Sequence, residues 1–201
     1  MTDVDSLQRR KLSNAALIAQ TQFNYSLMSL NWRFLTLLGQ LKPAAAAAAV
    51  LPPHWAASPM AARLRQLSCA ERVVAAQCPI ALFDAKLEQW GRAEPSPSPA
   101  VNPWTELVQL AGALVWHSVR REPVMAALGF GLRQDTVTHW QTLSYNHMGT
   151  GAGQFSPRIG LRWPQSDEFW QQLLAASEAG DAAELRALRR LCVQLQGADM
   201  L

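Results

Sequence analysis

Residues that could carry out chemistry are few in this 201-residue chain and stand far apart. The sequence contains no G-x-S-x-G motif, which a serine hydrolase would use to present its nucleophile. The glycine-rich run at residues 149–153 lacks the lysine of a phosphate-binding loop, so we expect an ordinary loop there. None of the histidines has a carboxylate at a spacing typical of catalysis: His54, His117, His139 and His147. The sequence therefore predicts a protein that is not an enzyme and that uses no cofactor.

The cysteines likewise form no recognisable site. Cys69, Cys78 and Cys192 make no C-x-x-C pair and stand at no zinc-binding spacing with histidine. An odd number of cysteines in a chain of this size argues against the disulfide framework of a small secreted protein. We therefore interpret them as reduced thiols of a cytoplasmic protein and expect no bound metal.

A long uncharged stretch near the N-terminus raises the question of a membrane span. No charged residue occurs between Lys11 and Arg33, but serine, asparagine, glutamine and threonine interrupt this stretch repeatedly. A bilayer core tolerates such a polar load poorly. The segment before it, residues 1–12, is acidic and then basic, with no apolar signal core behind it. We expect neither a signal peptide nor a membrane-spanning helix.

Basic residues remain as candidates for binding. The net charge is only +3, but just three of the 18 basic residues are lysines, and arginine suits phosphate and base edges well. Arg186, Arg189 and Arg190 share one side of an expected C-terminal helix, and Arg120 and Arg121 end another helix. Either cluster could contact DNA phosphates. Each is equally consistent with a solvated face or, at a helix C-terminus, with the general preference for cations there.

Hydrophobic periodicity predicts a mainly helical fold. Apolar residues recur at steps of three and four in the first long helix, with Asn24, Asn31 and Arg33 off its apolar stripe. Ser68 and Glu71 have the spacing of a capping box, which starts a helix. The expected helices span residues 7–41, 44–49, 60–66, 68–78, 104–121, 124–130, 134–144, 167–179 and 181–196.

Two short segments read as strands, at residues 80–87 and 159–163. A lone short strand is not stable in water, so we expect the two to pair with each other or with strands of another subunit. Between the halves lies a Pro/Ser-rich linker at residues 93–103, semi-extended by its composition.

The strand-containing segments belong to an internal repeat. Residues 67–87, LSCAERVVAAQCPIALFDAKL, align without a gap to LSYNHMGTGAGQFSPRIGLRW, 76 positions further on. The helices before them align at a shift of 80, so that Leu27 and Leu30 meet Leu107 and Leu110. Repetition of this kind indicates one structural unit used twice. We predict a first repeat at residues 1–92, the linker 93–103, and a second repeat with a C-terminal helical arm at 104–201.

These segments resemble a known family. NYSLMSLNWRFL at residues 24–35, an alanine-rich helix, and then LSCAERVVAAQCPIALFDAKL are similar to the FlhD family of bacterial flagellar regulators. Residues 20–90 carry most of the resemblance, and 104–196 carry a weaker one. The resemblance implies two FlhD-like helical repeats in tandem, packed about a pseudo-twofold axis with a small β-ribbon. Phe83 stands where the flagellar protein has an intersubunit cysteine, so no such disulfide is expected.

What the resemblance implies for function is a DNA-associated transcriptional activator subunit that works with an FlhC-like zinc-binding partner. It leaves open contact with RNA polymerase and association with further copies of the chain. The arginine clusters are then the candidates for DNA contact. The aromatic residues that we assign to the partner interface are Phe83, Trp163, Phe169 and Trp170. The alternative that the residues leave open is an adaptor or secretion-associated scaffold protein that binds no DNA, with a large apolar interface.

Overall fold

The computed structural model describes residues 3–41, 59–90, 102–145 and 159–180, and eight helical positions between 184 and 195. In the first helix, side chains are described from Ala16 onward. The expected helix at 44–49, most of the linker 93–103 and the glycine-rich run 149–153 lie outside these residues. The described part is mainly helical with one small sheet, as the sequence predicts.

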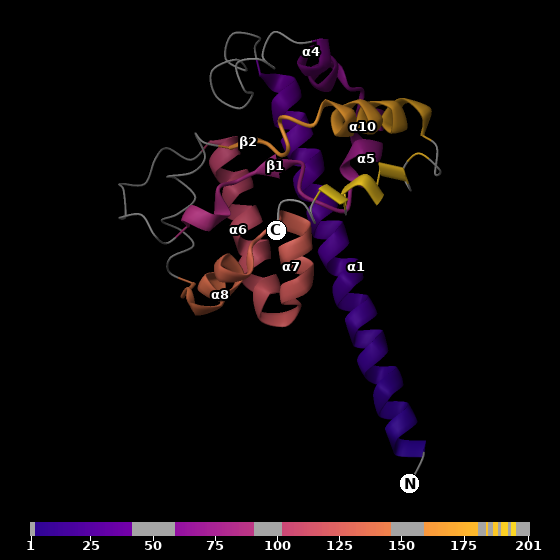
Figure 1. Cartoon of the computed structure of the whole chain (residues 1–201), viewed down its shortest axis with the longest axis vertical. Helices are drawn as coiled ribbons and strands as arrows, with labels where there is room; N and C mark the ends of the chain where they lie inside the picture. Colours follow the sequence, from indigo (N-terminus) through magenta and orange to yellow (C-terminus); the bar gives the residue numbers. More distant parts are fainter. Residues whose placement is uncertain are drawn as a thin grey trace.

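Helix α1 (Asp3–Gln40) is the longest element and runs along the whole molecule (Figure 1). Its N-terminal half projects beyond the other helices, whereas its C-terminal half lies between two groups of them. One face of that C-terminal half is buried and mostly apolar, with Leu27, Phe34 and Leu38 at 1% exposure or less. The predicted stripe therefore forms the central part of the core.

Two short helices follow on one side of α1. Helix α4 (Pro59–Gln66) buries Leu64, and helix α5 (Cys69–Ala76) begins at the predicted capping box. The backbone N–H of Glu71 donates to Ser68 Oγ (3.2 Å), and the N–H of Ser68 donates to Glu71 Oε2 (2.7 Å). Hydrogen bonding to the Ser68 side chain, and next to the Ser68 backbone N–H, lowers the pKa of the Glu71 carboxyl below its usual value.

The second half of the chain supplies the helices on the other side of α1. Helix α6 (Pro103–Arg121) begins after Asn102, whose side chain accepts from the N–H groups of Trp104 and Thr105. Helix α7 (Pro123–Phe130) ends at Gly131, which takes the left-handed conformation that suits glycine (φ 64°). Helix α8 (Gln134–Thr142) follows directly. All three begin within two residues of their predicted starts.

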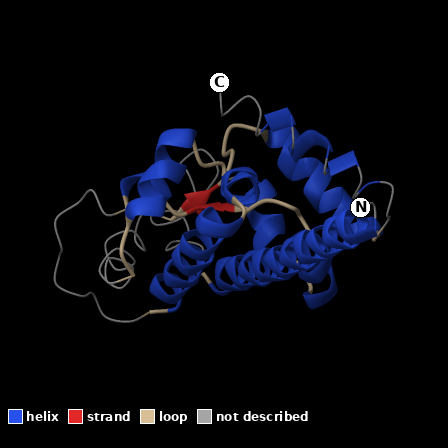
Figure 2. Cartoon of the chain, turned by 90° about the horizontal axis from the view of Figure 1, so that it is seen from below, coloured by secondary structure: helices blue, strands red, loops and turns tan. Residues whose placement is uncertain are grey.

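The two strands meet between these groups of helices, as Figure 2 shows in red. Strand β1 (Phe83–Asp84) pairs antiparallel with β2 (Gly160–Leu161), with Phe83 opposite Leu161 and Asp84 opposite Gly160. The prediction that the strands pair with each other is confirmed, but both are shorter than expected. After β1, a single 3-10 turn (Leu87–Gln89) leads to a buried tryptophan, Trp90.

Helix α10 (Asp167–Ala179) closes the described fold and ends at Gly180 (φ 63°), as predicted. It packs against α4 and α5. The described residues between 184 and 195 are helical, and Leu188 and Cys192 among them are buried.

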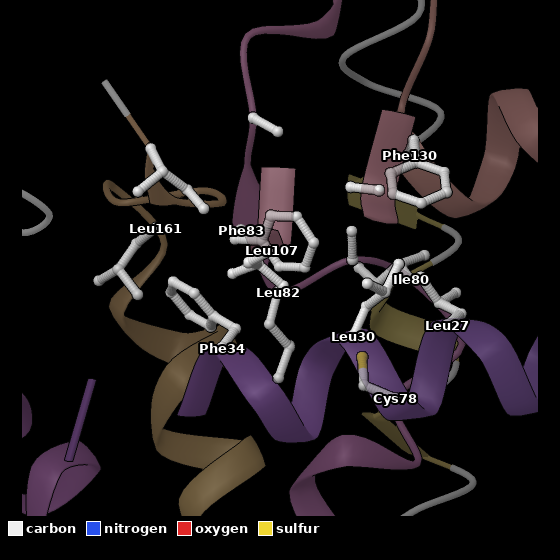
Figure 3. Packing of buried hydrophobic residues seen from close by; sticks show 14 of the residues in the cluster. Leu27, Leu30, Phe34, Cys78, Ile80, Leu82, Phe83, Leu107, Phe130 and Leu161 are labelled. Carbon is white, nitrogen blue, oxygen red and sulfur yellow. The ribbon is translucent and has the colours of Figure 1, made fainter. Parts of the chain in front are cut away.

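One hydrophobic core extends through both halves of the sequence. Figure 3 shows Phe34 of α1 near Phe83 of β1 and Leu27 of α1 near Ile80, with residues from α6, α7 and β2 around them. The rings of Phe34 and Phe83 lie 5.4 Å apart. Residues from α1 to Trp90, from α6 to α10 and from the C-terminal segment all contribute to this cluster.

Asn31 is a polar residue within the buried face of α1, and the prediction that it lies off the buried stripe was wrong. It is fully buried on α1. Its amide nitrogen donates to the carbonyl oxygens of Cys78 (3.2 Å) and Ile80 (2.8 Å), with a longer contact to Ala76 (3.5 Å). Its amide oxygen accepts from the N–H of Leu82 (2.9 Å). This one side chain thus bonds backbone groups of three residues in the segment between α5 and β1, namely Cys78, Ile80 and Leu82. The N–H of Ala81 and the carbonyl oxygen of Leu82 find their partners in Gly129 of α7 and in Arg162.

We predict that Asn31→Ala lowers the free energy of unfolding by about 2–5 kcal/mol, because it leaves several buried backbone groups without partners. Urea denaturation followed by circular dichroism measures this loss. The matched control is Asn24→Ala, an exposed asparagine of the same helix, which should change stability by no more than about 0.5 kcal/mol. Equal effects of the two substitutions would contradict the structural role of Asn31.

Candidate interaction surfaces

The C-terminal half of α1 carries apolar side chains on the face turned away from the core. Tyr25 and Trp32, two turns apart, are 65% and 42% exposed, and Leu17 and Ile18 continue the stripe toward the N-terminus at about 60%. The solvent-facing side of a helix is usually polar. Helix α1 therefore carries apolar residues on both faces, and the core covers only one of them.

A groove of about 590 Å³ follows this face, and we call it the α1 groove. Helix α1 provides most of its wall, α5 and α6 provide the rest, and the lining is largely apolar. The lining residues are Met28, Ser29, Leu30, Trp32, Arg33, Thr36, Leu37, Val73, Ala76 and Leu110. The hydroxyl oxygen of Thr36 is buried here without a hydrogen-bond partner among the described residues.

The charge at the rim of the α1 groove is neutralised within the chain. Arg33 forms an ion pair with Glu106 of α6, and both side chains are partly exposed. Because no other charged residue lies on α1 between Lys11 and Arg33, the groove faces solvent as a nearly neutral surface. Such a surface selects a partner by shape and apolar contact more than by charge.

A second hollow, of about 470 Å³, lies where α1 meets the end of α6 and the start of α7. It is more polar than the α1 groove. Tyr25 contributes from α1, and His117, Arg121 and Glu122 contribute from α6 and its C-terminus. Arg121, one of the predicted DNA contacts, is exposed at this hollow.

Arg120, the neighbouring candidate for DNA contact, is engaged within the chain. Its guanidinium donates to the carbonyl oxygens of Gln141 (3.1 Å) and Leu143 (2.6 Å), at the C-terminus of α8, and to that of Trp116 (2.7 Å). It also lies 4.0 Å from the centre of the Trp116 ring. A cation at this position complements the partial negative charge of the helix end. Arg120 therefore joins α6 to α8.

The remaining basic candidates lie in the C-terminal segment. Arg190 is helical and exposed. Arg186 and Arg189 lie outside the described residues, so the predicted common face of the three is not described.

The four aromatic residues expected at a partner interface lie inside the chain. Phe83, Phe169 and Trp170 are at most 1% exposed, and Trp163 is 9% exposed. The rings of Trp163 and Trp170 both meet Phe169 edge to face at 5.1 Å. These residues pack α10 and the strands together, so in this conformation they offer almost no surface to a partner. Exposed aromatic surface lies instead at Trp32, in the α1 groove, and at Tyr25, in the second hollow. The seven-residue spacing of these two residues was the available sequence signal.

Within the described residues, histidine, cysteine and carboxylate side chains form no group that could hold a metal ion. His139 instead has its Nε2 2.9 Å from the carbonyl oxygen of Trp90. Nor does any described helix combine the length and apolarity needed to cross a bilayer. The chain matches no family model, no curated protein and no solved structure.

The structural role of Arg120 leads to a prediction. Arg120→Ala should lower the free energy of unfolding by about 1 kcal/mol or more, because the carbonyl oxygens at the end of α8 lose a charged donor. Arg121→Ala serves as the matched control, since its side chain is exposed, and we expect a change of no more than about 0.5 kcal/mol. Thermal and urea unfolding of both variants measure the difference. Equal stability of the two variants would show that Arg120 does not join α6 to α8.

Proposed function

We propose that this chain is a tandem FlhD-like regulatory subunit that binds a partner protein through the α1 groove and reaches DNA within that complex. The observation that carries the proposal is the strand register. Asp84 lies opposite Gly160, and Gly160 is the residue 76 positions later that the internal repeat matches to Asp84. An antiparallel pair in which a residue faces its own repeat equivalent is what a local twofold relation between the halves requires.

The helices support the same relation. Helix α8 (Gln134–Thr142) occupies the positions 76 residues after α4 (Pro59–Gln66), to within one residue. Helix α6 covers the positions 80 residues after the C-terminal half of α1. The contacts also correspond: α4 packs on α1, α8 packs on α6, and α1 packs on α6.

The backbone conformation just after each strand is also similar in the two halves. Lys86 (φ 52°) and Trp163 (φ 46°) each lie two residues after the end of their strand. A left-handed conformation is unusual for residues other than glycine. The repeat alignment matches Lys86 to Arg162, one position before Trp163, so the two left-handed residues correspond to within one residue. Their closeness supports a common origin for the two strand segments.

The occupant that suits the α1 groove is a helix of the partner with an uncharged, apolar face. The groove runs along α1, so anchors spaced three, four and seven residues apart would follow it. Its neutral surface gives a charged peptide nothing to pair with, because Arg33 is already matched by Glu106. Docking would also cover Thr36, whose buried hydroxyl lacks a partner among the described residues. The resemblance names the partner class as an FlhC-like zinc-binding subunit.

We predict that Trp32→Glu weakens binding of a co-expressed FlhC-like subunit by about thirtyfold or more, because it places a charge at the centre of an apolar contact. Val124→Glu is the matched control, since Val124 is exposed to 69% on α7, away from the α1 groove. Isothermal titration calorimetry with both variants gives the affinities, and circular dichroism checks that both remain folded. Tight binding by the Trp32 variant would contradict this docking site.

DNA contact by the C-terminal helix is tested through its salt dependence. Replacing Arg186, Arg189 and Arg190 by alanine should reduce the slope of log K against log salt concentration by about three, roughly one for each phosphate that is no longer neutralised. The complex with the FlhC-like subunit is titrated with duplex DNA at several salt concentrations. Arg133→Ala, at another exposed arginine, should leave the slope unchanged. An unchanged slope for the triple variant would remove this helix from the DNA interface.

The second candidate is an adaptor or scaffold subunit that binds protein but not DNA. One observation favours it: Arg120 directs its donors to carbonyl oxygens of its own chain and not to an exposed basic face. The two candidates differ in one measurable respect. The adaptor forms the partner complex through the α1 groove, yet the complex shows no salt-dependent affinity for DNA.

A further inference from the structure

Two of the three cysteines lie side by side, although they are 114 positions apart in sequence. Cys78 Sγ and Cys192 Sγ are 3.5 Å apart. Both side chains are buried, at 3% and 0% exposure. Cys69, in contrast, is exposed at the start of α5. The sequence offered no spacing that would join Cys78 to Cys192, because their contact depends on the docking of the C-terminal segment.

The two sulfurs are held by very different parts of the fold. Cys78 belongs to the segment fixed by Asn31: its carbonyl oxygen accepts from that amide, and its N–H donates to the carbonyl oxygen of Ala75 (3.1 Å). Figure 3 shows Cys78 beside the helix turn that carries Leu27 and Leu30. Cys192 belongs to the C-terminal helical segment, whose described side chains alternate between buried and exposed. Cys78 is therefore held by the core, whereas the position of Cys192 depends on the C-terminal segment.

We propose that Cys78 and Cys192 are a reversible disulfide pair whose oxidation fastens the C-terminal helical segment to the core. A disulfide has its sulfurs about 2.05 Å apart, so closure requires an approach of about 1.5 Å, within reach of side-chain rotation and a small shift of a terminal helix. This inference does not depend on the regulatory role proposed above. It depends only on the contact between the two sulfurs.

Cys78 and Cys192 react slowly while they are in contact and buried. Only the thiolate form of cysteine is reactive, and burial of the pair disfavours that form. The hydrogen bond to Cys78, together with burial, raises the pKa of the Cys192 thiol far above its ordinary value. Exchange therefore begins when the C-terminal segment opens locally and exposes both thiols to water. Only two of the described side chains between 184 and 195 are buried, and segments with few buried contacts open in this way more readily than the core. On reclosing, the two sulfurs return to contact.

The oxidant is a low-molecular-weight disulfide such as oxidised glutathione. One cysteine thiolate attacks a sulfur of the reagent, which forms a mixed disulfide and releases one glutathione thiolate. The second cysteine thiolate attacks the protein sulfur of that mixed disulfide and releases the second glutathione. The pair loses two protons and two electrons, and the reagent is reduced to two thiols. A small thiol in excess reverses both steps.

The test uses the purified chain incubated with oxidised glutathione and then digested, because the exposed Cys69 can take up glutathione independently. We expect one cross-linked peptide containing Cys78 and Cys192, two hydrogens lighter than its two component peptides. Proteolysis of the C-terminal segment should slow by about tenfold, because the cross-link restricts local opening. Dithiothreitol should restore the original mass and the original cleavage rate. Cys69→Ser, at the exposed cysteine, should leave all three results unchanged.

Substitutions of Cys78 and Cys192 test the proposal directly. Cys78→Ser and Cys192→Ser should each abolish the cross-link and its protection, and each should leave a single glutathione adduct on the remaining partner. Circular dichroism establishes that the variants are folded, and Cys78→Ala or Cys192→Ala replaces the corresponding serine variant if it is not. Modification of Cys69 alone, or a cross-link involving Cys69, would overturn the proposal. So would a cross-link between Cys78 and Cys192 that leaves the cleavage rate unchanged.

Discussion

A single buried amide on α1 determines how the rest of this fold is put together. The segment between α5 and β1 is neither helix nor extended sheet, so its peptide groups need partners from elsewhere. Asn31 supplies them through both ends of its side chain. That contact sets the position of the segment along α1. It thereby positions β1 for pairing with β2 and Cys78 for its contact with Cys192. It also positions Trp90 against α6. The Trp90 ring packs so closely on Gly112 of α6 that a methyl group at that position would collide with it.

The helices could be predicted from the sequence because their signals are local. The Ser68–Glu71 capping box, the apolar stripe of α1 and the glycine after α10 each depend on residues a few positions apart. The strands were predicted too long for a reason that is not local. Ala81 donates to the carbonyl oxygen of Gly129 in α7 (2.7 Å), and Leu82 donates to Asn31. The backbone that would have extended β1 is thus already bonded to other elements.

The surfaces were harder to predict than the elements. Aromatic residues were expected at an interface, yet Phe169 and Trp170 have no exposed surface, while Trp32 remains partly open to solvent. Sequence composition does not say which face of a mainly apolar helix finds a neighbour. Arginine poses the same difficulty. The pattern placed Arg120 on a basic patch, and only the position of α8 reveals that its guanidinium is bound to two carbonyl oxygens at that helix end.

The two strands carry a consequence for how the chain reaches this state. Each has only two residues, and the pairing joins positions 76 residues apart in sequence. So short a ladder returns too few hydrogen bonds to offset the entropy of closing such a loop by itself. It can therefore form only once α6 has docked on α1 and brought the strands together. We therefore expect the two-stranded sheet to form late in folding, after the helices that carry its strands have docked.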